Sequence, residues 1–202
     1  EKIFTIQPSF RAEKSKTSRH LTEYWHAEME AAWEGFDYLQ DDAEQVVKDV
    51  VKKVLEKNLR ELKILERDVK KLEPALKKKF PRMTYTEALK ILKDKKKMNV
   101  PWGKDLRTIE EDKLSELYDT PIIVTKYPKK VKAFYMKEDP ENPEVVLGFD
   151  MIGPEGYGEI IGASQREENI EKLKDRLKEE GEDTEKYEFY FDTRRYGSVP
   201  HG

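Results

Sequence analysis

The period of the apolar residues changes twice along the chain, and this limits the folds that the chain can adopt. Near the start, Phe4 and Ile6 alternate with polar residues, which is the period of a strand. Over residues 41–97 the apolar residues recur every three or four positions, as in an amphipathic helix. Residues 118–202 return to short apolar runs. The sequence therefore predicts an α+β fold with an antiparallel sheet flanked by helices.

The N-terminal part reads as a hairpin. A strand-like run over residues 2–10 is followed by a hydroxyl-rich, basic loop over residues 14–19 and by an aromatic run over residues 21–33. Two such runs around a polar loop predict two antiparallel strands within residues 3–33, with a long tip.

The middle part is expected to be helical over residues 41–97. Asp41 and Glu44 have the spacing of a capping box, which predicts the start of the first helix. Thr84 and Glu87 repeat that spacing before a second apolar stretch.

The C-terminal part carries strands and one helix. We expect strands over residues 121–127 and 131–136, a hairpin of 145–151 with 157–161 around the turn 153–156, a helix that ends at Gly181, and an aromatic run over 187–191 that packs against this helix.

The composition excludes several classes of protein. Charged residues make up 40% of the chain and hydrophobic ones 37%, and no apolar run approaches the roughly 20 residues of a membrane helix. No basic segment with an apolar stretch opens the chain, so we expect no signal peptide. The chain has 0 Cys, so a disulfide framework and thiolate metal sites are excluded. We expect a cytoplasmic protein without membrane contact.

The sequence begins and ends within segments that have a clear secondary-structure pattern. Glu1 is not an initiator Met and already precedes a strand-like run, and the last residues are His201 and Gly202. The expectation is a piece of a longer protein.

Charged and aromatic side chains gather on the N-terminal hairpin: Arg11, Glu13, Arg19, His20, Glu23 and Tyr24. Side chains of two paired strands that face one way converge on one surface. Arg presents a planar fork that matches phosphate oxygens, and an aromatic face can stack a base. This surface is either a nucleotide cradle or an ion-pair network on a charged sheet.

A second set of polar residues surrounds the predicted turn 153–156. Asp150 and Glu159 stand on adjacent strands, and Arg166 follows seven residues after Glu159. Mg²⁺ prefers one or two carboxylates together with substrate phosphates. The alternative is a surface hairpin with ordinary acidic residues. Apolar neighbours such as Phe149 imply a buried setting, where unpaired carboxylates are costly, and this favours a magnesium site.

Long motifs in these segments resemble a known family. The stretch FRAEKSKTSRHLTEYWHAEME (residues 10–30) resembles motif 2 of the class II aminoacyl-tRNA synthetases, in the form of the aspartate, asparagine and lysine subgroup. The stretches GFDMIGPEGYGEIIGASQRE (148–167) and YGSVPHG (196–202) are similar to the asparaginyl-tRNA synthetases, particularly the archaeal type. The resemblance covers nearly the whole chain.

The resemblance implies the class II catalytic fold and a two-step reaction. ATP and asparagine would give asparaginyl-adenylate and pyrophosphate, with Mg²⁺ bound to the ATP. The asparaginyl group would then pass to the terminal ribose of tRNA(Asn). The resemblance further implies a homodimer of the full-length protein.

Roles in ATP binding are implied for five residues of the hairpin. Arg11 resembles the Arg that grips the α-phosphate and stabilises the charge that develops there. Glu13 resembles the residue near the adenine amino group and the tRNA end. Tyr24 stands where the family stacks a ring on adenine, and Arg19 and His20 match the pair that holds the outer phosphates.

The amino-acid pocket and the metal site follow from the same resemblance. Asp150 and Glu159 match the Mg²⁺ carboxylates, and Arg166 matches the Arg that binds the substrate's side-chain carbonyl. Glu28 aligns with the Glu that reads the side-chain amide. A carboxylate accepts a hydrogen bond from –NH₂ but repels a second carboxylate, so Glu28 would favour asparagine over aspartate.

The polar tip of the hairpin matches the loop that contacts the tRNA acceptor end in this family. Lys14 and Lys16 can neutralise phosphates, and Ser15 and Thr17 can bond bases or sugars of single-stranded RNA. Without the resemblance, the same residues would make an ordinary solvated loop.

Several parts of the family pattern are missing from this sequence. The anticodon-reading OB-fold, motif 1 and motif 3 are not present in the 202 residues, so we expect the centre of a catalytic domain and weak activity of this piece alone. Gly162 replaces an oxygen donor often seen at its position.

Three other functions compete with an asparagine–tRNA ligase. One is an aspartyl-tRNA synthetase, and another is a synthetase-derived asparagine synthetase that amidates aspartyl-adenylate with ammonia. The third is a non-catalytic RNA-binding or assembly module. Glu28 and the GYGEIIGASQRE stretch weigh against the first, and retention of Arg11, Asp150, Glu159 and Arg166 weighs against the third.

Overall fold

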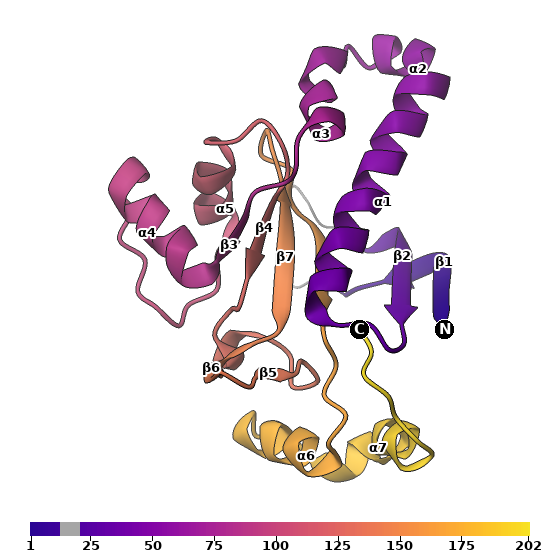
Figure 1. The fold of residues 1–202 in the computed structure, drawn as a ribbon, viewed down its shortest axis with the longest axis vertical. Coiled ribbons are helices and arrows are strands. Elements are labelled where there is room, and N and C mark those ends of the chain that lie inside the picture. The colour runs from indigo at the N-terminus through magenta and orange to yellow at the C-terminus, as the bar shows by residue number, and fades with distance from the viewer. Residues whose placement is uncertain (13–20) are drawn as a thin grey trace.

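The computed structural model describes residues 1–12 and 21–202. Its centre is a four-stranded sheet in the order β3-β4-β7-β8, in which β3 runs parallel to β4 and the other neighbours are antiparallel. These strands are β3 (Arg82–Thr84), β4 (Ile122–Thr125), β7 (Gly148–Gly153) and β8 (Gly158–Ser164). Helices lie on both faces of the sheet (Figure 1). The predicted α+β fold is confirmed, and the sheet is antiparallel except at β3.

The N-terminal hairpin is a separate two-stranded sheet. β1 (Lys2–Phe10) pairs with β2 (Glu23–Ala31) in a regular antiparallel register that sets Lys2 opposite Ala31 and Phe10 opposite Glu23. The second strand is shorter than the aromatic run over 21–33. Large apolar side chains of this hairpin stay exposed, including Phe4 at 79% and Trp25 at 72%.

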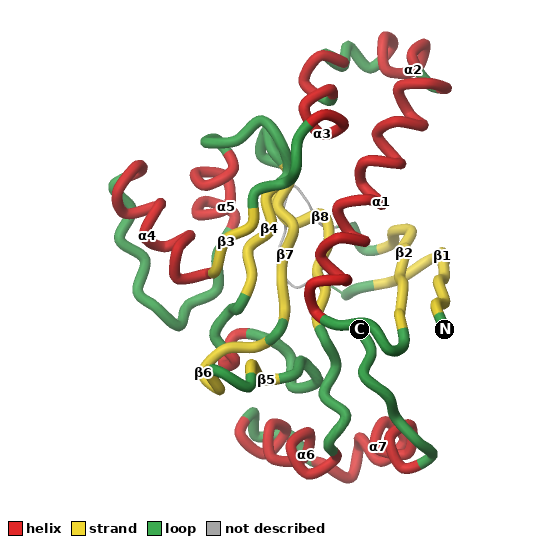
Figure 2. Tube along the Cα trace, in the orientation of Figure 1, coloured by secondary structure: helices red, strands yellow, loops and turns green. Residues whose placement is uncertain are grey.

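In chain order within the described residues, three helices lie between the hairpin and β3, two lie between β3 and β4, and two follow β8. They are α1 (Phe36–Lys57), α2 (Leu59–Ile64), α3 (Glu73–Lys77), α4 (Tyr85–Lys96), α5 (Thr108–Ser115), α6 (Ile170–Glu179) and α7 (Glu188–Arg195), with 3₁₀ turns η1 (Val69–Lys71), η2 (Lys129–Val131) and η3 (Thr184–Tyr187). Figure 2 shows α1 and α3 on one side of the sheet, and α4 and α5 on the other.

The predicted start of the first helix is wrong. α1 begins at Phe36, and Asp41 and Glu44 lie inside it. Both carboxylates bind the Arg82 guanidinium, at 2.6 Å from Asp41 and 3.2 Å from Glu44. Residues three positions apart share one face of a helix, so both carboxylates can reach the same guanidinium. Arg82 lies 41 residues after Asp41 and 38 residues after Glu44.

The second capping box is confirmed. The Thr84 side chain accepts from the Glu87 N–H, and the Glu87 carboxylate accepts from the Thr84 N–H at 2.7 Å. Thr84 also ends β3, a strand that the helical interpretation of residues 41–97 missed. Three residues are too few to show a period of two in the sequence.

The sheet is buried on both faces. Ile122 and Val124 face α4 and α5, where they join Tyr85, Leu92 and Leu114 in one apolar cluster. Ile123 faces the other way. It packs with Leu39 and Ala43 of α1, with Phe80, and with Phe149 and Met151 of β7. The alternation along β4 thus fixes which helices cover each face.

The strand expected over residues 131–136 is absent from the structure. Residues 129–131 form η2, and the following residues form a bend and turn. A short sheet of β5 (Glu138–Asp139) and β6 (Asn142–Val146) comes next. One aromatic side chain of this segment, Phe134, packs against Tyr187 and Tyr190 at ring distances of 5.1 and 5.7 Å.

The C-terminal helices form a small apolar cluster of their own. Leu173 and Leu177 of α6 are fully buried against Phe191 of α7, so the predicted packing of the 187–191 run is confirmed. α6 ends at Glu179, and Gly181 takes a φ of 76°, which is the left-handed conformation expected of a residue that ends a helix.

The last residues return to the N-terminal hairpin. The Ala31 N–H donates to the Gly202 carbonyl at 2.8 Å, and both chain ends lie beside the first turn of α1 (Figure 1).

Within residues 1–12 and 21–202, no helix combines the length and the apolar character that a membrane span requires.

Candidate functional site

One face of β2 carries four polar side chains in alternation: Tyr24, His26, Glu28 and Glu30. The Tyr24 and His26 rings lie 5.6 Å apart at 55°. The Glu28 carboxylate lies 3.7 Å from His26 Nδ1, and its side chain is 48% exposed. The four side chains thus form one polar face of the hairpin.

Arg11 lies directly after β1. Its N–H donates to the Thr22 carbonyl at 2.9 Å, which continues the hairpin pairing by one step. Seven other residues with predicted roles lie outside the described residues: Glu13, Lys14, Ser15, Lys16, Thr17, Arg19 and His20.

Arg166 lies just beyond β8 in a pocket of about 290 Å³. The pocket is lined by Glu30, Tyr135, Arg166, Tyr190, Arg194 and His201. The Arg166 guanidinium donates to Glu30 Oε1 from Nη2 at 3.0 Å and from Nε at 3.3 Å. Its centre lies 4.5 Å from the Tyr135 ring, so the guanidinium is held by a charge on one side and by an aromatic face on another.

Glu30 is a site residue that the sequence reasoning missed. It stands two positions after Glu28, so the period of the strand places both on one face, and this spacing could have identified it. Oε1 of Glu30 binds Arg166, whereas Oε2 is buried without a hydrogen-bond partner among the described residues.

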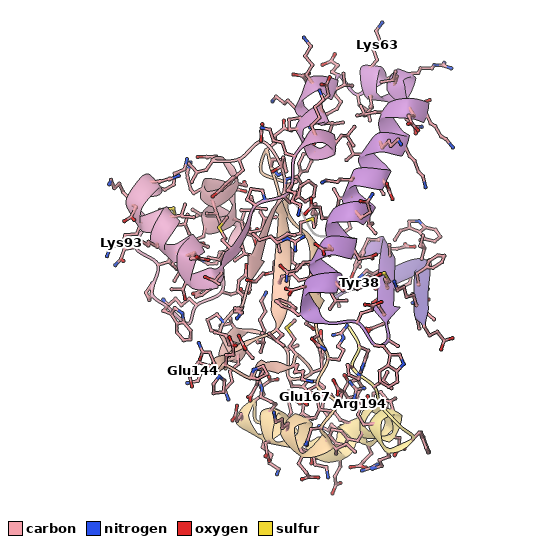
Figure 3. All side chains as sticks on the ribbon, in the orientation of Figure 1. Tyr38, Lys63, Lys93, Glu144, Glu167 and Arg194 are labelled. Carbon is pink, nitrogen blue, oxygen red and sulfur yellow. The ribbon has the colours of Figure 1, made fainter. Side chains whose placement is uncertain are left out.

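Tyr190 and Arg194 of α7 complete the wall of the pocket. Arg194 Nη2 donates to the Tyr190 hydroxyl at 2.7 Å and to the Glu167 carbonyl at 3.2 Å. Figure 3 shows Arg194 beside Glu167, where α7 meets the segment after β8. Burial raises the pKa of Tyr190, so its hydroxyl keeps its proton and its capacity to donate.

The predicted pair of carboxylates meets over Gly162. Asp150 of β7 is opposite Gly162 of β8, while Glu159 lies nearer the turn. A Cβ at Gly162 would lie 2.6 Å from Glu159 Oε1 and 4.0 Å from Asp150 Oδ1. Glycine at this position therefore leaves the room into which both carboxylates project. The sequence had suggested only that Gly162 lacks an oxygen ligand.

Lys132 is a second residue that the sequence reasoning missed. Its ammonium lies 2.6 Å from Asp150 Oδ2 and 3.8 Å from Asp105 Oδ1, and 4.1 Å from the centre of the Tyr127 ring. The Lys132 side chain is only 12% exposed. Burial disfavours its charge, but Asp150 and Asp105 more than offset this, so its pKa is raised.

The Glu159 carboxyl holds its proton more firmly than an ordinary Glu. Loss of water contact raises its pKa to about 7, with further increases from the charges of Asp150, Glu111 and Asp105, while Lys132 opposes them. The cluster is therefore short of positive charge near neutral pH. Among the described residues, no group of three or more His, Cys, Asp or Glu side chains is arranged to hold a metal ion. An ion at Asp150 and Glu159 would need further oxygens from water or a ligand.

The two parts of the site lie along β8 and the segment that follows it. The carboxylates meet over Gly162, four positions before Arg166, which corresponds to about 13 Å of extended chain. The arrangement suits an elongated ligand whose charged end lies near the carboxylates and whose other end lies in the Arg166 pocket.

Comparison with known proteins gives a consistent result over the whole chain. The family profile "tRNA synthetases class II (D, K and N)" matches residues 1–202. The asparagine–tRNA ligase of Pyrococcus furiosus is 51% identical over 204 residues, and that of Thermoplasma acidophilum is 51% identical over 203 residues. Each alignment covers 100% of this chain and 46% of the relative, so the chain spans about half the length of these relatives.

Solved structures give the same relationship. The asparaginyl-tRNA synthetase of Pyrococcus horikoshii, complexed with asparaginyl-adenylate, is 51% identical with a TM-score of 0.94, and the match covers 100% of this chain and 46% of that one. The aspartyl-tRNA synthetase of Entamoeba histolytica is 29% identical with a TM-score of 0.85, and the match covers 99% of this chain and 42% of that one.

Proposed function

This chain belongs to the class II tRNA synthetases of the D, K and N type, and from that membership we propose that its full-length protein is an asparagine–tRNA ligase. The proposed substrates are ATP, asparagine and tRNA(Asn). The higher identity to asparagine–tRNA ligases than to the Entamoeba aspartyl enzyme supports asparagine rather than aspartate.

The observation that carries the proposal is the position of Arg166 beside the acidic face of β2. A neutral side-chain amide needs a donor for its carbonyl and an acceptor for its –NH₂. Arg166 supplies the donor, and the carboxylates of Glu28 and Glu30 alternate on the neighbouring strand. An aspartate side chain would bring a second negative charge to this face, and such a contact costs several kcal/mol.

In the proposed first step, the asparagine carboxylate attacks the α-phosphorus of ATP, and pyrophosphate leaves as the mixed anhydride forms. Arg11 would hold the α-phosphate and stabilise its developing charge. Tyr24 would stack on adenine, and its ring stands on the same strand face as the acidic residues. In the second step, a terminal ribose hydroxyl of the tRNA attacks the asparaginyl carbonyl, and AMP leaves.

Mg²⁺ is the metal that the family implies, and Asp150 and Glu159 fit it. Both are hard oxygen donors, and Gly162 leaves open the space between them. When bound, Mg²⁺ would neutralise charge on the ATP phosphates. Lys132 would keep Asp150 in one orientation, because its ammonium binds Oδ2 and leaves Oδ1 toward Gly162.

The assembly and location of the full-length protein follow from the family. We propose a homodimer in the cytoplasm. Sedimentation of the full-length protein at two concentrations would test the dimer.

Asparagine-dependent ATP–pyrophosphate exchange by the full-length protein tests the proposed function. We expect exchange with asparagine and little with aspartate, followed by charging of tRNA(Asn). Exchange with aspartate alone would indicate an aspartyl enzyme, and formation of free asparagine from aspartate and ammonia would indicate an amidating enzyme. No exchange with either amino acid would favour a non-catalytic RNA-binding or assembly module.

A further inference from the structure

The charges of this chain are strongly segregated. Residues 48–79, here called the helical arm, contain twelve Lys and Arg but six Asp and Glu, a formal charge of +6. Because the whole chain carries −3, the remaining residues carry −9. The arm comprises the second part of α1 together with α2, η1 and α3. Figure 1 shows it projecting beyond the sheet.

The cations of the arm are available at its surface. Seven of them are exposed and take part in no ion pair with a described residue: Lys52, Lys53, Lys57, Arg60, Lys63, Lys70 and Lys79. Lys63 stands at the far tip of the arm in Figure 3. A charged surface that served stability alone would be expected to pair its cations with neighbouring carboxylates.

Some of these cations are placed against one another. Lys53 and Lys57 are four residues apart on α1, as are Lys48 and Lys52, of which Lys48 also pairs with Glu44 at 2.6 Å. The Cβ atoms of residues at this spacing lie about 5–6 Å apart, and like charges there destabilise a helix. Neutralisation by a bound polyanion would remove this repulsion. Lys48 and Lys52 also border a groove of about 710 Å³, whose wall includes Leu55 and Leu76 together with the carboxylates of Asp49 and Glu56, so the groove itself is not cationic.

The return segment of the arm, between α2 and α3, is fixed to the sheet. The Arg67 guanidinium donates to both oxygens of Glu155, at 3.0 and 2.5 Å, and Lys71 lies 3.0 Å from the same carboxylate. Glu155 belongs to the turn between β7 and β8. The arm is therefore held against the strands that carry Asp150 and Glu159, and its cations are presented at a set position.

From these observations we propose that the helical arm binds the phosphate backbone of a double-helical segment of RNA. Phosphates in a duplex offer closely spaced negative charge without sequence requirement, which matches a row of unpaired, exposed Lys and Arg. The proposal rests on the proposed function, because a tRNA stem is the duplex that such an enzyme meets. It assigns to the arm a contact that is separate from the acceptor end.

The test compares two triple variants of the full-length protein. The first is Lys52→Gln, Lys53→Gln and Lys57→Gln on the arm. The second, a matched control, is Lys90→Gln, Lys93→Gln and Lys95→Gln on α4, where the three side chains are also exposed and free of ion pairs with described residues. Figure 3 shows Lys93 at the left of the view, well apart from Lys63 at the top. Gln and Lys have similar helix propensities, so both variants should fold.

Binding of tRNA(Asn) transcript and of a short RNA duplex without overhang is measured between about 50 and 200 mM salt. We expect the arm variant to bind both RNAs roughly 10- to 100-fold more weakly at low salt, with a salt slope smaller by about 2–3, because each phosphate contact contributes about one unit. The control should change neither quantity. Equal loss in both variants, or an unchanged slope in the arm variant, would overturn the proposal.

ATP–pyrophosphate exchange separates this proposal from the proposed function. Both variants should exchange at the rate of the unaltered protein, because neither touches the proposed site. If exchange is absent from the unaltered protein but the arm variant still loses duplex binding, the proposed function fails and the arm proposal holds. Binding of the arm to acidic protein in place of RNA would overturn it.

Discussion

Glu30 and Arg166 are joined by two hydrogen bonds of 3.0 and 3.3 Å, although 136 residues separate them in sequence. Both bonds end on Oε1 and Tyr135 packs against the guanidinium, so the guanidinium is fixed in position.

Glu30→Gln is expected to lower kcat/KM for asparagine-dependent exchange by roughly 10- to 100-fold, because Arg166 loses its charged anchor and a small displacement of a substrate-binding group is costly. Preference for asparagine over aspartate should change less than in Glu28→Gln, because the charge of Glu30 is already paired with Arg166. Glu144→Gln, on an exposed residue of β6, is the control. Activity equal to that of this control would show that Glu30 does not position Arg166.

Glu28→Gln is expected to relax the discrimination between asparagine and aspartate. The loss of a repelling carboxylate removes up to several kcal/mol, on the order of a thousandfold in selectivity. The measurement is the ratio of kcat/KM for the two amino acids in pyrophosphate exchange. An unchanged ratio would exclude Glu28 as the amide-reading residue.

Glu159→Gln is expected to remove a pH-dependent loss of stability. Because the pKa of Glu159 is raised from 4.5 to about 7, the folded protein keeps a proton there that the unfolded chain releases. Its ionisation therefore weakens the metal-free fold as the pH rises from about 4.5 to 7.

The side chain of Glu159 is partly exposed, so the effect is modest, about 2–4 °C in melting temperature between pH 5 and 8. Melting curves of the unaltered protein and of Glu159→Gln should diverge over this range, and Mg²⁺ should restore only the unaltered protein. Parallel curves would contradict the raised pKa.

Lys132→Met is expected to destabilise the protein by about 3–5 kcal/mol in urea, because it leaves the buried Asp150 carboxylate without its partner. The double variant Lys132→Met with Asp150→Asn should cost much less than the sum of the two single changes. Strict additivity would mean that the pair does not interact energetically.

Local signals account for the parts of the fold that were predicted. The Thr84–Glu87 capping box and the β7–β8 hairpin depend on residues close together in sequence, where spacing and turn chemistry decide. The predicted start of α1 was wrong because Asp41 and Glu44 have the spacing of a capping box but bind Arg82. Sequence spacing alone does not distinguish these two uses.

The candidate site shows the same division. Asp150, Glu159 and Arg166 lie in a long motif, so they could be chosen from sequence. Lys132 and Glu30 stand in ordinary charged surroundings, and only the fold brings them to Asp150 and Arg166. Their importance depends on contacts between distant segments, which a pattern of neighbours does not contain.

The pocket around Arg166 also has a consequence for the order of folding. Glu30 lies on β2, whereas His201, another residue of the pocket wall, follows 171 residues later. Contacts between such distant segments form slowly, because a long loop must close before they contribute. During synthesis the hairpin leaves the ribosome well before either Arg166 or His201 exists. The Arg166 pocket is therefore among the last parts of this chain to assemble, and a newly made chain acquires its hairpin and sheet before it acquires this pocket.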